Sequence, residues 1–136
     1  MLPKSDRLRR AKDFALLSQK GRVIYSPFYA LRLRPSREPT KVGFVTSTKV
    51  FKTAVKRNRA KRRMREVLRL LKTEWPKHAD LLFILKYDVL HAAFPDLQAA
   101  VRRSFEKIPE ALSRPPTPRK NIKARRKSSV VYKENP

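Results

Sequence analysis

The pattern of hydrophobic positions opens with a helical spacing. Phe14 and Leu17 fall on one face of a helix predicted over residues 11–20. Gly21 is a suitable terminator, because glycine readily adopts the left-handed conformation that ends many helices. The sequence therefore predicts a short amphipathic helix ahead of the first strand.

A two-residue alternation follows the helix. Residues 23–34 are expected to be extended, with one apolar and one mainly basic face. The apolar face holds Tyr29, Leu31 and Leu33, and the other face holds Ala30, Arg32 and Arg34. Residues 35–40 predict a turn, and the β-branched and aromatic residues 41–48 are typical of the next strand.

The spacing then returns to that of a helix. Residues 53–75 place their apolar side chains in one stripe, and Pro76 ends this helix. The stripe consists of Ala60, Met64, Val67, Leu68, Leu71 and Trp75. The apolar run at 80–87 predicts a buried central strand, and a last helix is expected from Pro95 to near Pro109. The order α–β–β–β–α–β–α predicts an α+β fold, an α/β sandwich.

Charge adds a partner to this picture. The 136 residues include 35 Lys or Arg and 11 Asp or Glu, for a net charge of +24. Residues 49–72 hold eleven basic residues and one Glu, whereas residues 73–113 have a net charge of −1. Such an uneven distribution indicates a scaffold that carries a surface for a polyanion.

Composition excludes several classes of protein. The chain has no cysteine, which excludes disulfides and thiolate metal sites, and two histidines cannot form a three-histidine site. No apolar run is long enough to span a membrane, and the first residues lack the apolar core of a signal peptide. We therefore expect a cytoplasmic protein with no membrane partner.

The chain divides into two parts. Residues 1–113 are predicted to form a single α/β domain that binds a polyanion. The basic, proline-containing residues 114–136 are predicted to form a disordered tail. The tail is either an arm that binds phosphates or a solubilising segment without a specific partner.

The strongest chemical signal is the cation density of residues 52–69. Like charges at helical i, i+4 spacing destabilise an isolated helix, and an ordinary solvated basic face carries compensating glutamates. Only Glu66 is present in this segment. Phosphate groups would compensate these charges through bidentate, charge-assisted hydrogen bonds.

Specific residues now resemble a known family. Arg57-Asn58-Arg59, followed by Lys61, Arg62 and Arg65, is similar to the R-N-R signature of the bacterial ribonuclease P protein component. Further residues fit the family's order from about residue 4 to 110: Arg7-Leu8, Asp13-Phe14, Gly21, Val42-Gly43-Phe44, Lys49 and Ala54. The resemblance implies a four-stranded sheet with an unusual left-handed β-α-β crossover.

The resemblance also implies two RNA-binding faces. The signature helix would contact the catalytic RNA, and the residues assigned to it are Lys49, Lys56, Arg57, Asn58, Arg59, Lys61, Arg62, Arg65 and Arg69. A cleft between the first helix and the sheet would hold the single-stranded 5′ leader of precursor tRNA. Its candidates are Phe14, Phe28 or Tyr29, Arg32 and Arg34, since single strands bind aromatic platforms beside cations. Core packing is the alternative for each aromatic residue.

No protein active site is predicted. Metal-assisted phosphodiester cleavage commonly uses clustered carboxylates, whereas the acids here are scattered, with Asp88 and His91 the closest pair. A loop or cap role suits that pair better than a catalytic or metal site. The resemblance implies that the RNA subunit cleaves the leader with Mg²⁺ held mainly by RNA and substrate, and that no protein partner is required.

Two other functions fit the charge. A ribosomal-type RNA-binding protein would be equally basic but would lack the D-F…R-N-R order. A helix-based DNA reader would use residues 57–72 as its recognition helix and would need a turn-linked helix before it. The strand-like residues 41–48 argue against the DNA reader.

Overall fold

The fold is a four-stranded sheet with two long helices on one side. The computed structural model describes residues 4–8, 14–17 and 21–115. The strands are β1 (Arg22–Tyr25), β2 (Tyr29–Pro35), β3 (Lys41–Val45) and β4 (Ala79–Leu85). The long helices are α2 (Ala54–Leu70) and α3 (Phe94–Ser113), and residues 14–17 are also helical. Three short 3-10 helices are η1 (Lys4–Asp6), η2 (Lys72–Glu74) and η3 (Tyr87–Leu90).

The strand order is β1-β2-β4-β3. β2 pairs antiparallel with both β1 and β4, whereas β3 and β4 are parallel neighbours joined through α2. The order of helices and strands along the chain and the α+β class confirm the sequence-based prediction. The left hand of the β3–α2–β4 crossover stays an expectation from the resemblance.

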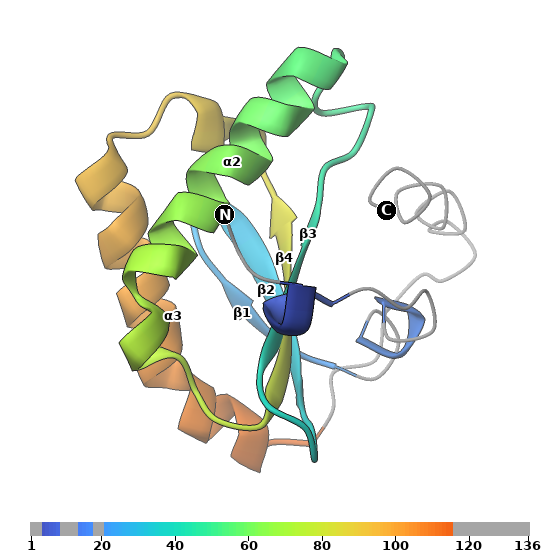
Figure 1. Ribbon diagram of the computed structural model, residues 1–136, viewed down its shortest axis with the longest axis vertical. Helices are drawn as coiled ribbons and strands as arrows, with labels where there is room; N and C mark the ends of the chain where they lie inside the picture. The colour runs from blue at the N-terminus through green and yellow to red at the C-terminus, as the bar shows by residue number, and fades with distance from the viewer. Residues whose placement is uncertain (1–3, 9–13, 18–20, 116–136) are drawn as a thin grey trace.

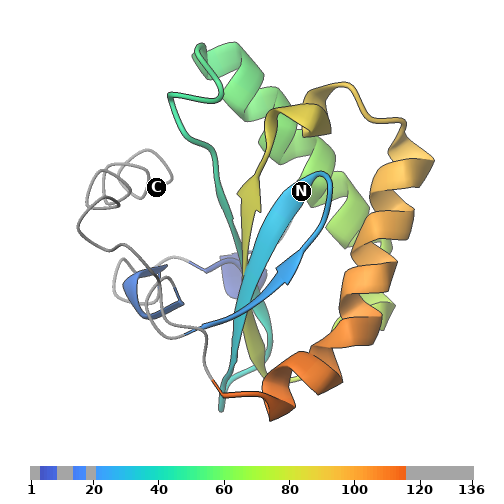
Figure 2. The ribbon, with the colours of Figure 1, turned by 180° about the vertical axis from the view of Figure 1, so that it is seen from behind.

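The main core lies between the sheet and the two long helices (Figures 1 and 2). The predicted alternation in β2 is confirmed, because Tyr29, Leu31 and Leu33 are all buried there. The apolar stripe of α2 packs on the same layer through Ala60, Met64, Val67, Leu68 and Leu71. None of the described helices is long and apolar enough to cross a membrane.

The opposite face of the sheet carries a smaller second core beneath the N-terminal segment (Figure 2). It consists of Leu8, Phe14, Leu17, Val45 and Leu82. Gly43 allows this close approach, since a Cβ atom there would lie 3.1 Å from both the Phe14 ring and Leu8 Cβ. The segment also joins the sheet edge, because the Leu8 amide donates to the Val42 carbonyl at 2.8 Å.

Several predicted boundaries were wrong. The helix predicted over residues 53–75 ends at Leu70, and the separate 3-10 helix η2 follows it before Pro76. Residues 26–28 interrupt the extended segment 23–34, because the Ser26 amide bonds back to the Tyr29 carbonyl at 2.9 Å. β3 ends at Val45 rather than residue 48, since the Phe51 amide closes a turn on the Ser47 carbonyl. α3 continues past Pro109 to Ser113, with the proline exposed and Ile108 and Ala111 buried on either side.

Candidate nucleic-acid interface

The basic face of α2 is positioned by a well-defined helix start and end. The Thr53 hydroxyl accepts a hydrogen bond from the Lys56 amide at 3.2 Å, which caps the first turn. At the other end the Trp75 indole donates to the Leu68 carbonyl at 2.9 Å. Burial of the apolar stripe then fixes which side chains α2 turns to solvent.

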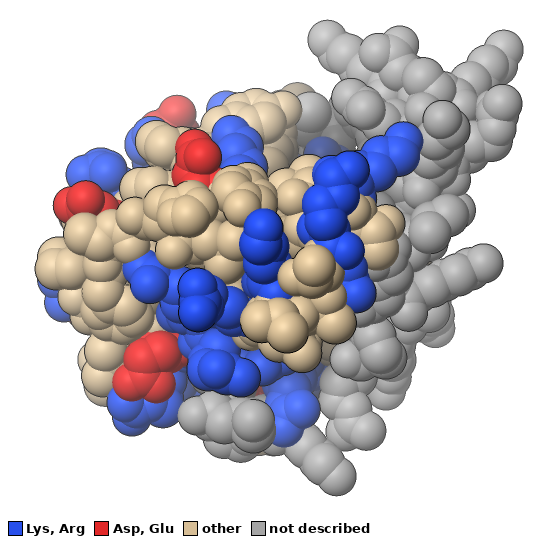
Figure 3. Space-filling model, turned by 90° about the horizontal axis from the view of Figure 1, so that it is seen from above, with Lys and Arg blue, Asp and Glu red and all other residues tan. Residues whose placement is uncertain are grey.

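Most of the predicted signature residues lie on the solvent side of α2. Asn58, Arg59, Arg62 and Arg69 are exposed on the helix, and Lys49 is exposed on the loop before it. Figure 3 views the molecule from the end where α2 begins, and Lys and Arg side chains gather across that surface with few acids among them. The predicted basic face is therefore present as a surface.

Several predicted RNA-binding residues have contacts within the protein. Lys61 is buried, at 8% exposure, so its position at the margin of the stripe places most of the side chain inside. Arg57 Nη1 donates to the Phe51 carbonyl at 3.0 Å, which uses part of that guanidinium to hold the β3–α2 loop. Lys56 Nζ donates to the Tyr87 hydroxyl at 3.2 Å and remains exposed.

A hollow of about 350 Å³ lies on this face, lined by Asn58, Arg62, Arg65 and Glu66. Burial lowers the pKa of Arg65, and the nearby guanidiniums of Arg7 and Arg62 lower that pKa further. Glu66 is directed to Arg69, whose Nε lies 3.0 Å from Glu66 Oε1. The converging guanidiniums form a setting that an anion would stabilise.

The predicted leader-cleft residues do not form one open cleft. Phe14, at 4% exposure, packs in the second core. Tyr29 is fully buried on the opposite face, where its hydroxyl contacts the Ala100 carbonyl at 3.1 Å and Ser104 Oγ at 2.6 Å. That burial raises the pKa of Tyr29 to about 12. Phe28 is half-buried against the main core, so the expectation that Phe28 or Tyr29 faces the cleft was wrong in this structure.

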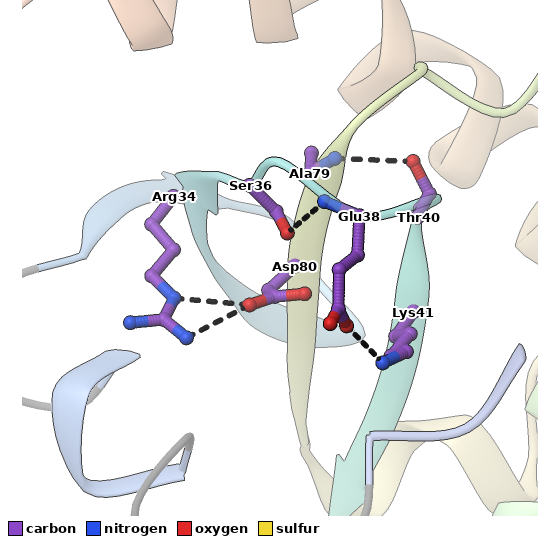
Figure 4. Close-up of polar contacts among 7 residues, drawn as sticks. All are labelled: Arg34, Ser36, Glu38, Thr40, Lys41, Ala79 and Asp80. Carbon is purple, nitrogen blue, oxygen red and sulfur yellow. Dashed lines mark hydrogen bonds and ion pairs between the residues drawn. The ribbon is translucent and has the colours of Figure 1, made fainter.

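The two arginines of β2 do lie on the face of the second core, but both have partners. Arg32 Nε donates to the Leu17 carbonyl at 2.7 Å and Arg32 Nη2 to the Gly21 carbonyl at 3.1 Å. Arg34 Nε donates to Asp80 Oδ2 at 3.0 Å across the β2–β4 pair, as Figure 4 shows. Arg32 is buried and fastens the N-terminal helical residues to the sheet, whereas Arg34 is half-buried.

An accessible aromatic residue on this face was missed from the sequence. Tyr25 is 72% exposed and pairs in register with Ala30, which pairs in turn with Ile84. Ala30 and Ile84 are half-buried, so this row leaves apolar surface accessible beside the second core. The parity of β1 would have revealed Tyr25, because its neighbour Ile24 faces the main core.

The described residues contain no group of three or more His, Asp or Glu side chains that would hold a metal ion. Asp88 and His91 are both exposed on η3 and the residue that follows it. The two residues are joined through the backbone, where the His91 amide donates to the Asp88 carbonyl at 3.1 Å. This geometry is that of a helix end.

Comparison with known proteins gives a consistent result. The Ribonuclease P family model matches residues 2–109. The chain is 39% identical over 102 residues to the ribonuclease P protein component of Chloroflexus aggregans, an alignment covering 74% of this chain and 75% of that protein. It is 38% identical over 112 residues to that of a Synechococcus strain, covering 79% and 84%.

Solved structures agree at the level of the fold. The RNase P protein of Staphylococcus aureus aligns with a TM-score of 0.65 at 21% identity, covering 80% of this chain and 99% of that chain. The RNase P protein of Thermotoga maritima aligns with a TM-score of 0.67 at 24% identity, covering 74% and 96%.

Proposed function

Because this chain belongs to the ribonuclease P protein family, the protein subunits of a tRNA-processing enzyme, we propose that it binds the catalytic RNA through α2. The observation that carries the proposal is the exposed cation density of α2 within the matched region. Residues 49–72 contain eleven basic residues and one Glu. The repulsion between these like charges destabilises the helix unless phosphate groups compensate it. The hollow at Arg62 and Arg65 would take one such phosphate.

The proposal includes contact with the 5′ leader of precursor tRNA on the face of the second core. Among the described residues, Tyr25 is an aromatic side chain exposed on this face, and an exposed tyrosine is a sequence-tolerant stacking platform. Arg34 would add a cation on the same face of the sheet, further along β2. Phe14 and Arg32 would act indirectly, by holding the N-terminal segment against the sheet.

The chemistry in this proposal belongs to the RNA subunit. The described side chains do not provide a ligand set for Mg²⁺, so the ion that assists cleavage would be held mainly by RNA and substrate. The chain's own role would be to bind substrate and offset phosphate repulsion. A subunit with this role would work in the cytoplasm, beside precursor tRNA and without a further protein partner.

Reconstitution with the cognate catalytic RNA tests the proposal. Cleavage of precursor tRNA is measured for protein alone, RNA alone and both together at low, near-physiological Mg²⁺. We expect no cleavage by protein alone and strong enhancement by the combination. The same assay is run with Arg62→Ala, which removes a cation from the basic face of α2. Its matched control is Lys107→Ala, which removes an exposed cation on α3. Cleavage by RNA-free protein that Asp88→Ala abolishes would contradict the proposal.

A further inference from the structure

Three aromatic rings form a column from the core to the surface beside the start of α2. The Tyr87 ring lies 5.9 Å from that of Phe51 and 5.4 Å from that of His91, measured between centroids. Phe51 is fully buried, Tyr87 is half-buried and His91 is exposed. The column therefore presents an imidazole to solvent, supported from behind by rings fixed in the core.

The backbone that carries the column is itself anchored. η3 buries Val89 and Leu90, and the His91 amide bonds to the Asp88 carbonyl at 3.1 Å. The Lys86 amide donates to the Phe28 carbonyl at 2.9 Å, which ties the start of the turn to the sheet. Because this backbone is anchored, binding of a planar ligand to the His91 ring need not order the turn as well.

Cations from α2 flank the column. Lys56 Nζ lies 3.2 Å from the Tyr87 hydroxyl and 5.6 Å from the centroid of the Tyr87 ring. Arg63 donates to the carbonyl of Ala92, the residue after His91. Asp88 is the single acid in residues 86–93. The surroundings favour a ligand that carries a flat apolar ring and a negative charge.

We propose that His91 and Lys56 form a binding site for one unpaired nucleotide of the catalytic RNA. The base would stack on the exposed face of the His91 ring, and its phosphate would contact Lys56. Aromatic platforms beside cations bind single-stranded nucleotides in this way, whereas bases within a duplex already stack on each other. The inference rests on the proposed function, because RNA bound along the first turns of α2 would run directly past the column.

The test compares binding of the catalytic RNA by full-length variants at fixed salt. His91→Ala should weaken binding roughly 5- to 20-fold, the lower part of the range for loss of one stacked base because imidazole is a small platform. His91→Phe keeps an aromatic face and should bind as the wild type does. The matched control is His78→Asn, because His78 is exposed in the loop between η2 and β4 and asparagine tolerates its φ of 57°.

Two further measurements separate stacking from charge. The logarithm of the binding constant falls linearly with the logarithm of the salt concentration. His91→Ala should leave the steepness of this line unchanged, whereas Lys56→Ala should reduce it by about one unit. In an assay of RNA 2′-hydroxyl acylation, one unpaired nucleotide should become less reactive when wild-type protein or His91→Phe binds. The same nucleotide should stay reactive with His91→Ala. A thermal melt of each variant checks that the fold is intact.

The outcomes distinguish this inference from the proposed function. Wild-type protein that fails to bind the RNA would overturn both. If Arg62→Ala weakens RNA binding while His91→Ala gives the same binding and acylation as the wild type, the inference is overturned and the proposed function is not. Equal weakening by His91→Ala and His91→Phe, or by His78→Asn, would also overturn it, since none of those results depends on the aromatic face at position 91.

Discussion

Replacing Phe14 by alanine tests whether this ring packs in the protein or stacks on RNA. Phe14 is buried in the second core, a cluster that also contains Leu8, Leu17, Val45 and Leu82. Removing a buried phenylalanine costs about 3–5 kcal/mol of folding stability. We expect about 3 kcal/mol, because the cluster is small and the segment above it can settle into the space. For a domain of this size that loss lowers Tm by about 10–20 °C.

The assay pairs thermal unfolding of the free variant with titrations of precursor and mature tRNA against the holoenzyme. Leu17→Ala is the matched control, because Leu17 lies in the same cluster and has no ring to stack. We expect both variants to have a lowered Tm. We expect each variant to weaken binding of precursor tRNA and of mature tRNA by the same factor. Phe14→Ala protein that melts as the wild type does, yet loses affinity for precursor tRNA alone, would show that the ring leaves the cluster to stack on the leader.

Three further predictions follow from other sites. Arg62→Ala and Arg65→Ala should weaken binding of the catalytic RNA and reduce the steepness of its salt dependence by about one unit or less, with Tm barely changed. Variants with a lowered Tm and normal binding would show that these arginines stabilise the fold and do not bind RNA. Tyr29→Phe tests the raised pKa of that hydroxyl. The protonated form stabilises the fold fully below pH 10, so the wild type should lose about 2–3 kcal/mol more than the variant in denaturant titrations between pH 10 and pH 12. Gly43→Ala should cost about 1–3 kcal/mol in the same measurement, because the new Cβ presses on Phe14 and Leu8; an unchanged stability would mean that the second core is loosely packed.

Hydrophobic spacing predicted the sheet and the helices well, because burial on one face leaves a period that is visible in the sequence. The apolar stripe of α2 and the inward residues of β2 were found where the pattern placed them. The end of α3 was mispredicted, since packing of Ile108 and Ala111 sustains the helix on both sides of Pro109. Such tertiary support cannot be read from local propensity.

The candidate site was less predictable than the fold. Arg32 and Lys61 are cations by sequence, yet both are largely buried. Long basic side chains pack their aliphatic stems against apolar surface, and the carbonyls that receive the Arg32 guanidinium come from a segment distant in the chain. Charge density therefore predicted an exposed basic face correctly, while which individual cations on it are accessible depends on packing.

The pairing of the N-terminal segment with β3 also bears on how the protein behaves when concentrated. An edge strand with free amides and carbonyls invites strand addition from other molecules, the first step of aggregation. Here Leu8 and Arg7 pair with the β3 edge at Val42, near the start of the strand. The other edge strand, β1, has four residues, and Arg22 Nε donates to the Arg114 carbonyl at 3.0 Å where α3 ends. Removing residues 1–8 would thus open an aggregation-prone edge, and a loss of activity in such a truncation would report self-association as well as any lost RNA contact.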